Sequence, residues 1–549
     1  MASALSALLL KEGINFIANW RIELTQQYPP WLILPAIGLV GGLISGWLVS
    51  AFAPTTAGGG IAQVKAYLEG VPVPMTLKVA VVKLIGATIA LGSGFVLGRE
   101  GPTIQMSSAF AAYLSKNLSN LSALRRQIVA AGAGAGLAAA FNAPIAGVLL
   151  VVEVLRRDAS SFTFGTAILG SFVGGVVARE LGANSLGIDL AKEVTKTDFA
   201  AQEIPFYLLL GLLAGSLGAL FNEGIISSLK FYKNRMPIPI ALRVGLAGLV
   251  TGAVLAFLPV TFRDHAGLQQ ILHSGQIEWT LAISAFVVQF LLTLVNYGSG
   301  VPGGLFAPTL ILGASLGYLV GLLAQIGLGI DWQVTYALAG MGAFFCASIR
   351  VPITAITIIF EMTQDFDLVL PLMVSSLFAF FIAERLSPGS LYDRLLEMNG
   401  ISLAAEKKNL PNDFMRLRAA DVMIRSVETL NVRANMTQVI KVFSQSDHRG
   451  FPVVDDNNNL VGIVTQKDVN EFLWQQSVSS VIKSEQVLLS QVMTRSPITV
   501  NPDTPLLDVI YLLYQKDLSR LPVMDNNKLV GLITRTDLLR AEANCINEV

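Results

Sequence analysis

The sequence predicts an all-α, polytopic membrane domain followed by a soluble α/β module. The 549 residues are 53% hydrophobic and only 14% charged, whereas a typical soluble domain is about 25% charged. The charges are unevenly placed: residues 401–549 hold 33 of the 76, about 22% of that segment, and residues 1–400 hold the other 43, about 11%. This pattern excludes a wholly soluble enzyme, a disordered chain and a secreted disulfide scaffold.

Long uncharged runs predict the membrane spans. Residues 127–152, 31–64 and 279–330 carry no charge over 26, 34 and 52 residues, and about 20 residues suffice to cross a bilayer. The longest run would measure about 78 Å as one helix, so we expect it to turn at the glycine-rich stretch 298–304. Met1–Leu10 lacks a basic leading segment and is not expected to be a signal peptide. About ten or more spans are predicted in all, the others near 77–97, 164–180, 206–221, 239–260 and 366–383.

The membrane block contains an internal repeat. The pattern GSG…GREGPT at 92–103 returns as GSG…GLFAPT at 298–309, an offset of 206 residues. Two glycines, Pro-Ile and a glutamate at 132–153 return at 340–361, an offset of 208. Duplicated membrane units commonly pack about a pseudo-two-fold axis with the binding site between them. We therefore expect two halves of roughly 200 residues that share one site.

The repeated loops predict that this site binds an anion. Each loop, 98–102 and 303–308, runs directly into an apolar helix. A helix N-terminus presents free backbone N–H groups and the positive end of the helix dipole. A cation site would instead need several acidic oxygens, and the charge-poor runs contain few: Glu100, Glu153 and Glu361.

These motifs resemble the CLC family of chloride channels and chloride/proton antiporters. GREGP at 98–102, GLFAP at 304–308 and FNAPIAG at 141–147 match the family's loops, and Tyr392 lies where the family has an anion-coordinating tyrosine. The resemblance implies a homodimer in the lipid bilayer, with an anion pathway in each subunit and no required cofactor. It also implies two inverted halves, roughly 31–185 and 205–395, within a transmembrane domain at 31–395.

The resemblance also implies the residues of the site. Glu100 would be the gating glutamate, whose carboxylate occupies an anion position until it is protonated. Taken without the resemblance, Glu100 could instead cap a helix or pair with Arg99. The backbone N–H groups of Leu305 and Phe306 and the hydroxyl of Tyr392 would bind the central anion. The loop residues that complete the implied site are Gly59, Gly60, Gly98, Arg99 and Gly101.

The sequence departs from the family at the first glycine loop. The family usually has GSGIP there, whereas residues 58–62 read GGGIA, so Gly59 replaces the serine and Ala62 the proline. One side-chain donor to the anion is therefore absent, although a backbone N–H or a water can replace it. Chloride is the expected anion, with nitrate, fluoride or another halide as alternatives.

A second departure concerns proton coupling. Many family antiporters have a second glutamate directly after the position of Glu153, and here that residue is Val154. A valine side chain cannot relay a proton, which favours channel-like, uncoupled conduction. The alternative is a chloride/proton antiporter with an altered proton path. Glu153 has a repeat mate, Glu361, and we interpret both as architectural.

The soluble block is a second duplication. VM-RS at 422–426 returns at 492–496, and VGIVTQKD at 461–468 returns as VGLITRTD at 530–537. Polar turns at 455–459 and 525–528 between short apolar runs predict hairpins in an α/β fold. The block resembles a tandem CBS pair. The expected boundaries are an N-terminal cytoplasmic segment at 1–30, a linker at 396–417, and CBS domains at 418–480 and 481–549.

The CBS resemblance implies a nucleotide site. The family's Thr-x-x-Asp signature appears as Thr465…Asp468 and Thr534…Asp537. The aspartate can accept hydrogen bonds from ribose hydroxyls of ATP, ADP or AMP, while the threonine can reach phosphate. The same residues also fit a helix-capping box, and both roles can hold together. Arg449 and Arg520 are further phosphate candidates or solvated surface residues.

Other functional classes are less consistent with the sequence. A divalent-cation transporter, which CBS pairs also regulate, would need more acids in the membrane. A membrane enzyme would need a catalytic set, and the three histidines form no H-E-x-x-H pattern. We expect no metal site. We also expect no nucleic-acid partner, because 38 basic residues balance 38 acidic ones. We expect a multi-pass protein of the cell membrane with its CBS module in the cytoplasm. The histidines and cysteines, for which we expect no catalytic or metal-binding role, are His265, His273, His448, Cys346 and Cys545.

Overall fold

The chain forms two compact units, Met1–Leu403 and Ala404–Val549. Much of the predicted linker at 396–417 lies outside the described residues, as do His265, His273 and Cys545. The computed structural model describes residues 2–116, 122–156, 161–182, 199–258, 278–329, 333–398, 417–446, 448–478, 487–515, 518–526, 528–534, 536–538 and 541.

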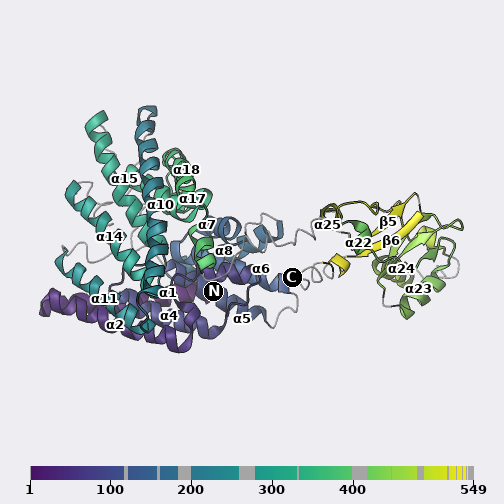
Figure 1. Ribbon diagram of the computed structural model, residues 1–549, viewed down its shortest axis with the longest axis horizontal. Helices are drawn as coiled ribbons and strands as arrows, with labels where there is room; N and C mark the ends of the chain where they lie inside the picture. Colours follow the sequence, from purple (N-terminus) through teal and green to yellow (C-terminus); the bar gives the residue numbers. More distant parts are fainter. Residues whose placement is uncertain are drawn as a thin grey trace. The chain divides into compact units, whose positions relative to one another are not determined.

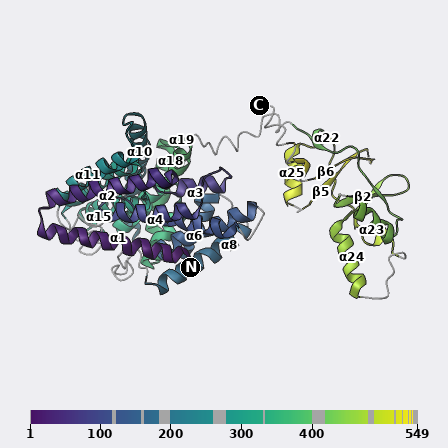
Figure 2. The ribbon, with the colours of Figure 1, turned by 90° about the horizontal axis from the view of Figure 1, so that it is seen from below.

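The described part of the first unit is helical (Figures 1 and 2). Six of its helices are long and apolar enough to cross a membrane, and three shorter apolar helices accompany them. The elements are α1 (Ala2–Gln27), α2 (Pro30–Phe52), η1 (Pro54–Thr56), α3 (Ile61–Leu68), α4 (Leu77–Gly92), α5 (Glu100–Ser115), α6 (Ser122–Phe141), α7 (Pro144–Leu149), η2 (Leu150–Arg156), α8 (Ser161–Glu180), η3 (Ala201–Glu203), α10 (Ile204–Asn234), α11 (Ile240–Phe257), α14 (Trp279–Ser299), α15 (Phe306–Leu328), α16 (Gln333–Ile349), α17 (Pro352–Thr363), α18 (Val369–Leu386) and α19 (Leu391–Met398).

Glycine and proline divide the long uncharged runs. The run at 279–330 turns where the sequence predicts: α14 ends at Ser299, Gly300 adopts a left-handed φ of 90°, and α15 begins at Phe306. The run at 127–152 is divided too, because Asn142 adopts a φ of 54° and Pro144 starts α7. Proline has no N–H to donate to a preceding turn, and at the first helical position none is needed.

Small residues let the helices approach closely. In Figures 1 and 2, α2 and α11 lie side by side. A Cβ added to Gly38 of α2 would lie 2.2 Å from the carbonyl oxygen of Gly248 of α11, and one on Gly42 would lie 2.5 Å from that of Val244. This is the small-residue contact that replaces hydrophobic collapse inside a bilayer.

The N-terminal residues belong to the helical unit. At 1–30, where we expect an N-terminal cytoplasmic segment, the structure has the 26-residue helix α1, which packs against α2, α4, α5, α6 and α8. Gly92 of α4 permits this contact, since a Cβ there would lie 2.6 Å from the Cβ of Ile17. The charged residues of α1 lower its hydropathy, which is the property by which spans are recognised from sequence. The sequence therefore gives no sign that this helix packs within the helical unit.

The second unit contains two intertwined α/β repeats. The hairpins predicted at 455–459 and 525–528 are confirmed, since they join β2 to β3 and β5 to β6 as antiparallel pairs. Strand β4 of the second repeat pairs with β3 of the first, and Ile424 of the first repeat bridges to Leu532 of the second. Each repeat therefore completes the sheet of the other. The elements are α22 (Ala419–Val422), β1 (Leu430–Asn431), α23 (Met436–Gln445), β2 (Gly450–Val454), β3 (Leu460–Thr465), α24 (Gln466–Val478), η5 (Leu489–Gln491), β4 (Thr494–Arg495), α25 (Leu506–Gln515), β5 (Arg520–Asp525) and β6 (Lys528–Thr534).

Candidate anion site

The two repeated loops meet at the backbone. The N–H of Gly98 donates to the carbonyl of Gly304 at 2.8 Å, and the N–H of Gly304 donates back to Gly98 at 2.7 Å. The first glycine loop joins them, because Gly303 donates to the carbonyl of Gly58 at 3.2 Å. Glycine is needed for this approach: a Cβ on Gly101 would lie 2.6 Å from the carbonyl oxygen of Gly59. Three segments that are distant in sequence thus surround one point.

Glu100 lies at this point and is 1% exposed. It begins α5, and its carboxylate faces its own backbone N–H and that of Ala307, in the first turn of α15. Its Oε2 has no hydrogen-bond partner within the described residues. The positive charge of Arg99 is near enough to act on the carboxylate. A negative group is thus placed at the N-termini of two helices, where free N–H groups and helix dipoles favour it.

A cavity of about 190 Å³ reaches Glu100. Its lining includes three basic side chains, Lys11 and Arg21 of α1 and Arg99 beside the glutamate. Gln289 of α14 also lines the cavity. Such a concentration of positive charge in a narrow space attracts anions and raises their local concentration. Neither α1 residue was singled out from the sequence.

Tyr392 is buried near Glu100. It is 2% exposed, and its hydroxyl has no hydrogen-bond partner within the described residues. Tyr297 and Glu100 are both near enough to act on this hydroxyl electrostatically. An unpaired buried hydroxyl is costly, so this donor is available to a ligand.

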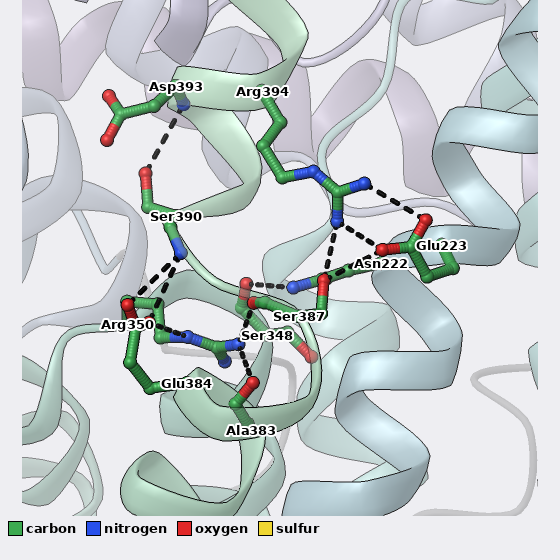
Figure 3. A network of polar contacts seen from close by, with 11 residues as sticks. Asn222, Glu223, Ser348, Arg350, Ala383, Glu384, Ser387, Ser390, Asp393 and Arg394 are labelled. Carbon is green, nitrogen blue, oxygen red and sulfur yellow. Dashed lines mark hydrogen bonds and ion pairs between the residues drawn. The ribbon is translucent and has the colours of Figure 1, made fainter. Parts of the chain in front are cut away.

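A polar network holds the helix that carries Tyr392 (Figure 3). Arg350, which follows α16, donates to the backbone carbonyls of Ala383 and Ser387 at 2.6 and 2.7 Å and to Glu384 at 2.9 Å. These bonds fix the turn between α18 and α19. Arg394 of α19 pairs with Glu223 of α10 at 2.8 Å.

A part-buried ion pair ties the same helix to α3, the helix that follows the first glycine loop. Lys65 of α3 donates to Asp393 at 2.5 Å, and the lysine side chain is 2% exposed. Lys83 of α4 is fully buried and donates to the carbonyl oxygens of Thr56 and Gly58 at 2.9 and 2.5 Å. Neither lysine belongs to a motif that the sequence singles out. Lys83 carried a usable signal, because an ionisable residue within an apolar span marks a functional position by default.

Gly59 and Gly60 lie in that loop, immediately before α3. Gly60 has a φ of 96° and precedes the first residue of the helix, Ile61. Leu305 and Phe306 lie at the start of α15 and are 1% and 0% exposed. The structure therefore brings the predicted loop residues together around Glu100 and Tyr392. These loop residues are Gly59, Gly60, Gly98, Arg99, Gly101, Leu305 and Phe306.

The two repeat-related glutamates cap helices of the opposite half. Glu153 accepts the backbone N–H of Ile353 at 3.3 Å and the N–H and hydroxyl of Thr354 at 2.8 and 2.6 Å, at the start of α17. Glu361 accepts the N–H groups of Ile145 and Ala146 at 2.9 and 2.8 Å, at the start of α7. These contacts agree with the architectural interpretation. Val154 is 4% exposed and lies on η2.

In the second unit, each predicted threonine pairs with its aspartate. Asp468 Oδ2 accepts the backbone N–H and hydroxyl of Thr465 at 2.7 and 2.8 Å. Asp537 Oδ2 accepts the corresponding groups of Thr534 at 2.9 and 2.6 Å. The helix-capping interpretation is therefore correct, and within the described residues no hydrogen bond to Oδ1 of either aspartate is seen. Burial, and after it the charge of nearby Arg449, lowers the pKa of the Arg520 guanidinium.

Comparisons with known proteins agree with this geometry. Residues 41–384 match the family model described as voltage gated chloride channel, and residues 419–475 and 489–544 match the CBS domain. The H(+)/Cl(-) exchange transporter ClcA of Vibrio cholerae serotype O1 is 34% identical over 411 residues, covering 72% of this chain and 85% of the relative. The ClcA of Salmonella paratyphi B is 30% identical over 428 residues, covering 74% and 89%.

Two solved structures are similar over long stretches. A slow cyanobacterial Cl⁻/H⁺ antiporter has a TM-score of 0.66 at 31% identity, covering 72% of this chain and 96% of the antiporter. A eukaryotic CLC transporter, at 23% identity, has a TM-score of 0.64 and covers 98% of this chain and 96% of its own, which shows the shared fold alone. From its matched residues, its relatives and its fold, the chain belongs to the CLC family of voltage-gated chloride channels and transporters, with a tandem pair of CBS domains after the membrane domain.

Proposed function

We propose that this protein transports chloride across a lipid bilayer and that Glu100 is the gate. The observation that carries the proposal is the position of the Glu100 carboxylate, buried where two helix N-termini and the first glycine loop meet. A carboxylate there imitates an anion in charge and in hydrogen bonding. Protonation removes its charge and releases it, and chloride then takes its place.

The surrounding groups are the ones that a chloride ion needs. Backbone N–H groups of the loops, the first turn of α15 and the unpaired hydroxyl of Tyr392 are all donors. The basic residues of the cavity, Lys11, Arg21 and Arg99, would draw anions toward Glu100. Because chloride binding needs only donors and positive potential, no cofactor is required for this step.

Proton coupling has two candidate outcomes. The buried Val154 offers no proton-carrying group, and the neighbouring carboxylate of Glu153 is engaged with α17, which favours uncoupled conduction. The names of the relatives, which are H⁺/Cl⁻ exchange transporters, favour antiport instead. An antiport mechanism here would require water to carry protons to Glu100.

Simultaneous flux measurements separate these two mechanisms. Purified full-length protein in liposomes under a chloride gradient, with the membrane potential clamped by an ionophore, is expected to release chloride without taking up protons. Protein-free liposomes are the control for leak. Proton uptake in fixed ratio to chloride would establish antiport and overturn the uncoupled mechanism. Absence of chloride flux, tested also with nitrate and fluoride, would contradict the transport proposal.

We further propose that the protein is a homodimer of the cell membrane, with each subunit transporting independently and the CBS module in the cytoplasm. The family membership and the six long apolar helices support this arrangement. A nucleotide-sensing module would meet its ligand in the cytosol. Nucleotide binding would regulate transport only by favouring one conformation of the pathway.

Adenine nucleotide is the proposed ligand of the CBS pair. Oδ2 of Asp468 and of Asp537 caps its helix, and Oδ1 of each, which has no partner in the part of the chain that the structure describes, would accept from ribose hydroxyls. Arg520 lies near a second guanidinium, that of Arg449. A phosphate group would relieve the repulsion between them and form charge-assisted hydrogen bonds.

Full-length protein is therefore expected to bind AMP, ADP or ATP saturably in equilibrium dialysis. Arg520→Gln is expected to weaken binding about tenfold, the effect of losing one hydrogen bond to a charged group. Arg433→Gln is the matched control, because Arg433 is 78% exposed and pairs with Asp456 at the surface. Equal affinity in wild type and Arg520→Gln would refute the phosphate assignment.

A further inference from the structure

We propose that the hydroxyl of Tyr297 is a direct ligand of the transported anion and takes the place of the side-chain donor that Gly59 cannot supply. This inference rests on the proposed anion site and adds a residue to it. Tyr297 is on the last turn of α14 and was not singled out by the sequence motifs. It immediately precedes the repeated GSG at 298–300.

The tyrosine oxygen borders the empty side-chain positions of the first glycine loop. A Cβ added to Gly58 would lie 3.5 Å from the hydroxyl oxygen of Tyr297, and a Cβ on Gly59 would lie 3.7 Å from it. The hydroxyl also faces the backbone N–H of Gly59. A serine hydroxyl at residue 59 would extend one bond beyond that Cβ, into the space that the tyrosine oxygen adjoins.

The contacts around Tyr297 hold its ring in place. Tyr297 is 5% exposed. The following residues end α14 tightly, because Gly300 adopts a left-handed φ of 90° and its N–H donates to the carbonyl of Tyr297 at 3.2 Å. Gly298 packs directly on α10, where a Cβ would lie 2.0 Å from Ser228 Oγ. The backbone that carries the tyrosine is thus held on both sides.

The chemistry of the hydroxyl fits a shared role. A hydroxyl can accept one hydrogen bond and donate another. The N–H of Gly59 faces the oxygen of Tyr297, so the oxygen can accept from that N–H while the hydroxyl proton donates to an anion. Tyr392, whose hydroxyl lacks a partner within the described residues, is close enough to Tyr297 and Glu100 to interact with both. Tyr392 thus links the hydroxyl of Tyr297 to the neighbourhood of the Glu100 carboxylate.

In this arrangement, one anion ligand belongs to the second half of the membrane domain and not to the first, as it does in the implied family pattern. In the implied family pattern the donor is part of the first loop, whereas here it extends from α14. Tyr297 is consequently a specificity-determining residue for this protein.

Chloride binding to purified full-length protein, measured by titration calorimetry, tests the proposal. Tyr297→Phe keeps the buried ring and removes only the oxygen, so the dissociation constant for chloride is expected to rise about five- to tenfold, the effect of one neutral hydrogen bond. Tyr336→Phe is the matched control, since Tyr336 is also buried and stacks on Tyr207 with ring centroids 4.4 Å apart. The control is expected to leave chloride affinity unchanged.

A rescue variant separates ligation from packing. The double variant Tyr297→Phe with Gly59→Ser returns a hydroxyl to the first loop and is expected to recover most of the lost affinity. The serine fits, because a Cβ on Gly59 meets no atom closer than 3.6 Å and the residue has no positive φ. Restored packing alone would not produce this recovery, since the serine does not refill the space of the lost oxygen.

The outcomes distinguish this inference from the proposed function. Wild-type protein that binds no chloride would overturn the anion site itself. Wild-type protein that binds chloride, with unchanged affinity in Tyr297→Phe, would overturn the role of Tyr297 alone. If Tyr297→Phe does not fold, Gly59→Ser in the wild-type background decides: the proposal expects no gain in affinity, because a hydroxyl is already present, and a clear gain would contradict it.

Discussion

Replacing Glu100 with alanine is expected to abolish the pH dependence of chloride flux and to leave conduction intact. The wild-type carboxylate is buried at the start of α5, and in the proposed mechanism it competes with chloride until it is protonated. With the carboxylate gone, no titrating group blocks the site. Flux of Glu100→Ala at neutral pH should exceed that of the wild type by about tenfold, which corresponds to roughly 1.4 kcal/mol of competition removed. Chloride efflux from liposomes at acidic and neutral pH measures both effects.

Two further variants test whether the effect comes from the charge of Glu100 and is specific to that residue. Glu100→Gln keeps the shape of the protonated side chain and should also give pH-independent flux. Glu180→Gln is the matched control, because Glu180 is exposed at the end of α8 and should behave as wild type. If Glu100→Ala folded but conducted nothing, Glu100 would be structural and the assignment of the gate would be wrong.

Replacing Glu153 with alanine is expected to destabilise the membrane domain severely. The change leaves the backbone N–H and hydroxyl of Thr354 without an acceptor, and Thr354 is fully buried. Each buried donor left unsatisfied costs about 1–3 kcal/mol, so the loss approaches about 2–6 kcal/mol. A fall in the thermal unfolding temperature of the purified protein, or failure to accumulate in the membrane, measures it.

The reciprocal contact provides an internal comparison. Glu361→Ala should destabilise the protein in the same way, because Glu361 accepts the N–H groups of Ile145 and Ala146. Glu180→Ala again serves as the exposed control. A Glu153→Ala protein that kept full stability, and lost only proton movement, would refute the architectural role and make Glu153 a proton carrier.

Repetition made part of the site predictable from sequence. The loops at 98–102 and 303–308 share a glycine and a proline at matching positions, and the structure joins them through Gly98 and Gly304. The repeat also paired Glu153 with Glu361. It did not reveal that each glutamate caps a helix of the other half, because an offset between copies gives their equivalence and carries no information on their contacts.

Other parts of the site were not predictable by these patterns. Tyr297 belongs to the site through its proximity to Gly59, a contact between residues 238 positions apart that no local motif encodes. Lys11 and Arg21 reach the cavity from a helix whose charges concealed its membership of the unit. Lys83 is the exception, since an ionisable residue in the middle of an apolar helix marks a functional position by default.

The mutual caps of Glu153 and Glu361 bear on the origin of the chain. Either half alone would leave its own glutamate without the helix start that it caps, and its own helix start without an acceptor. A single copy could satisfy both only against an identical second copy, through the self-complementary contact that a two-fold axis creates. One repeat of roughly 200 residues, standing alone, would therefore need to be an obligate pair. Two copies joined in one chain are paired permanently, so each can diverge in sequence, as GREGP and GLFAP do.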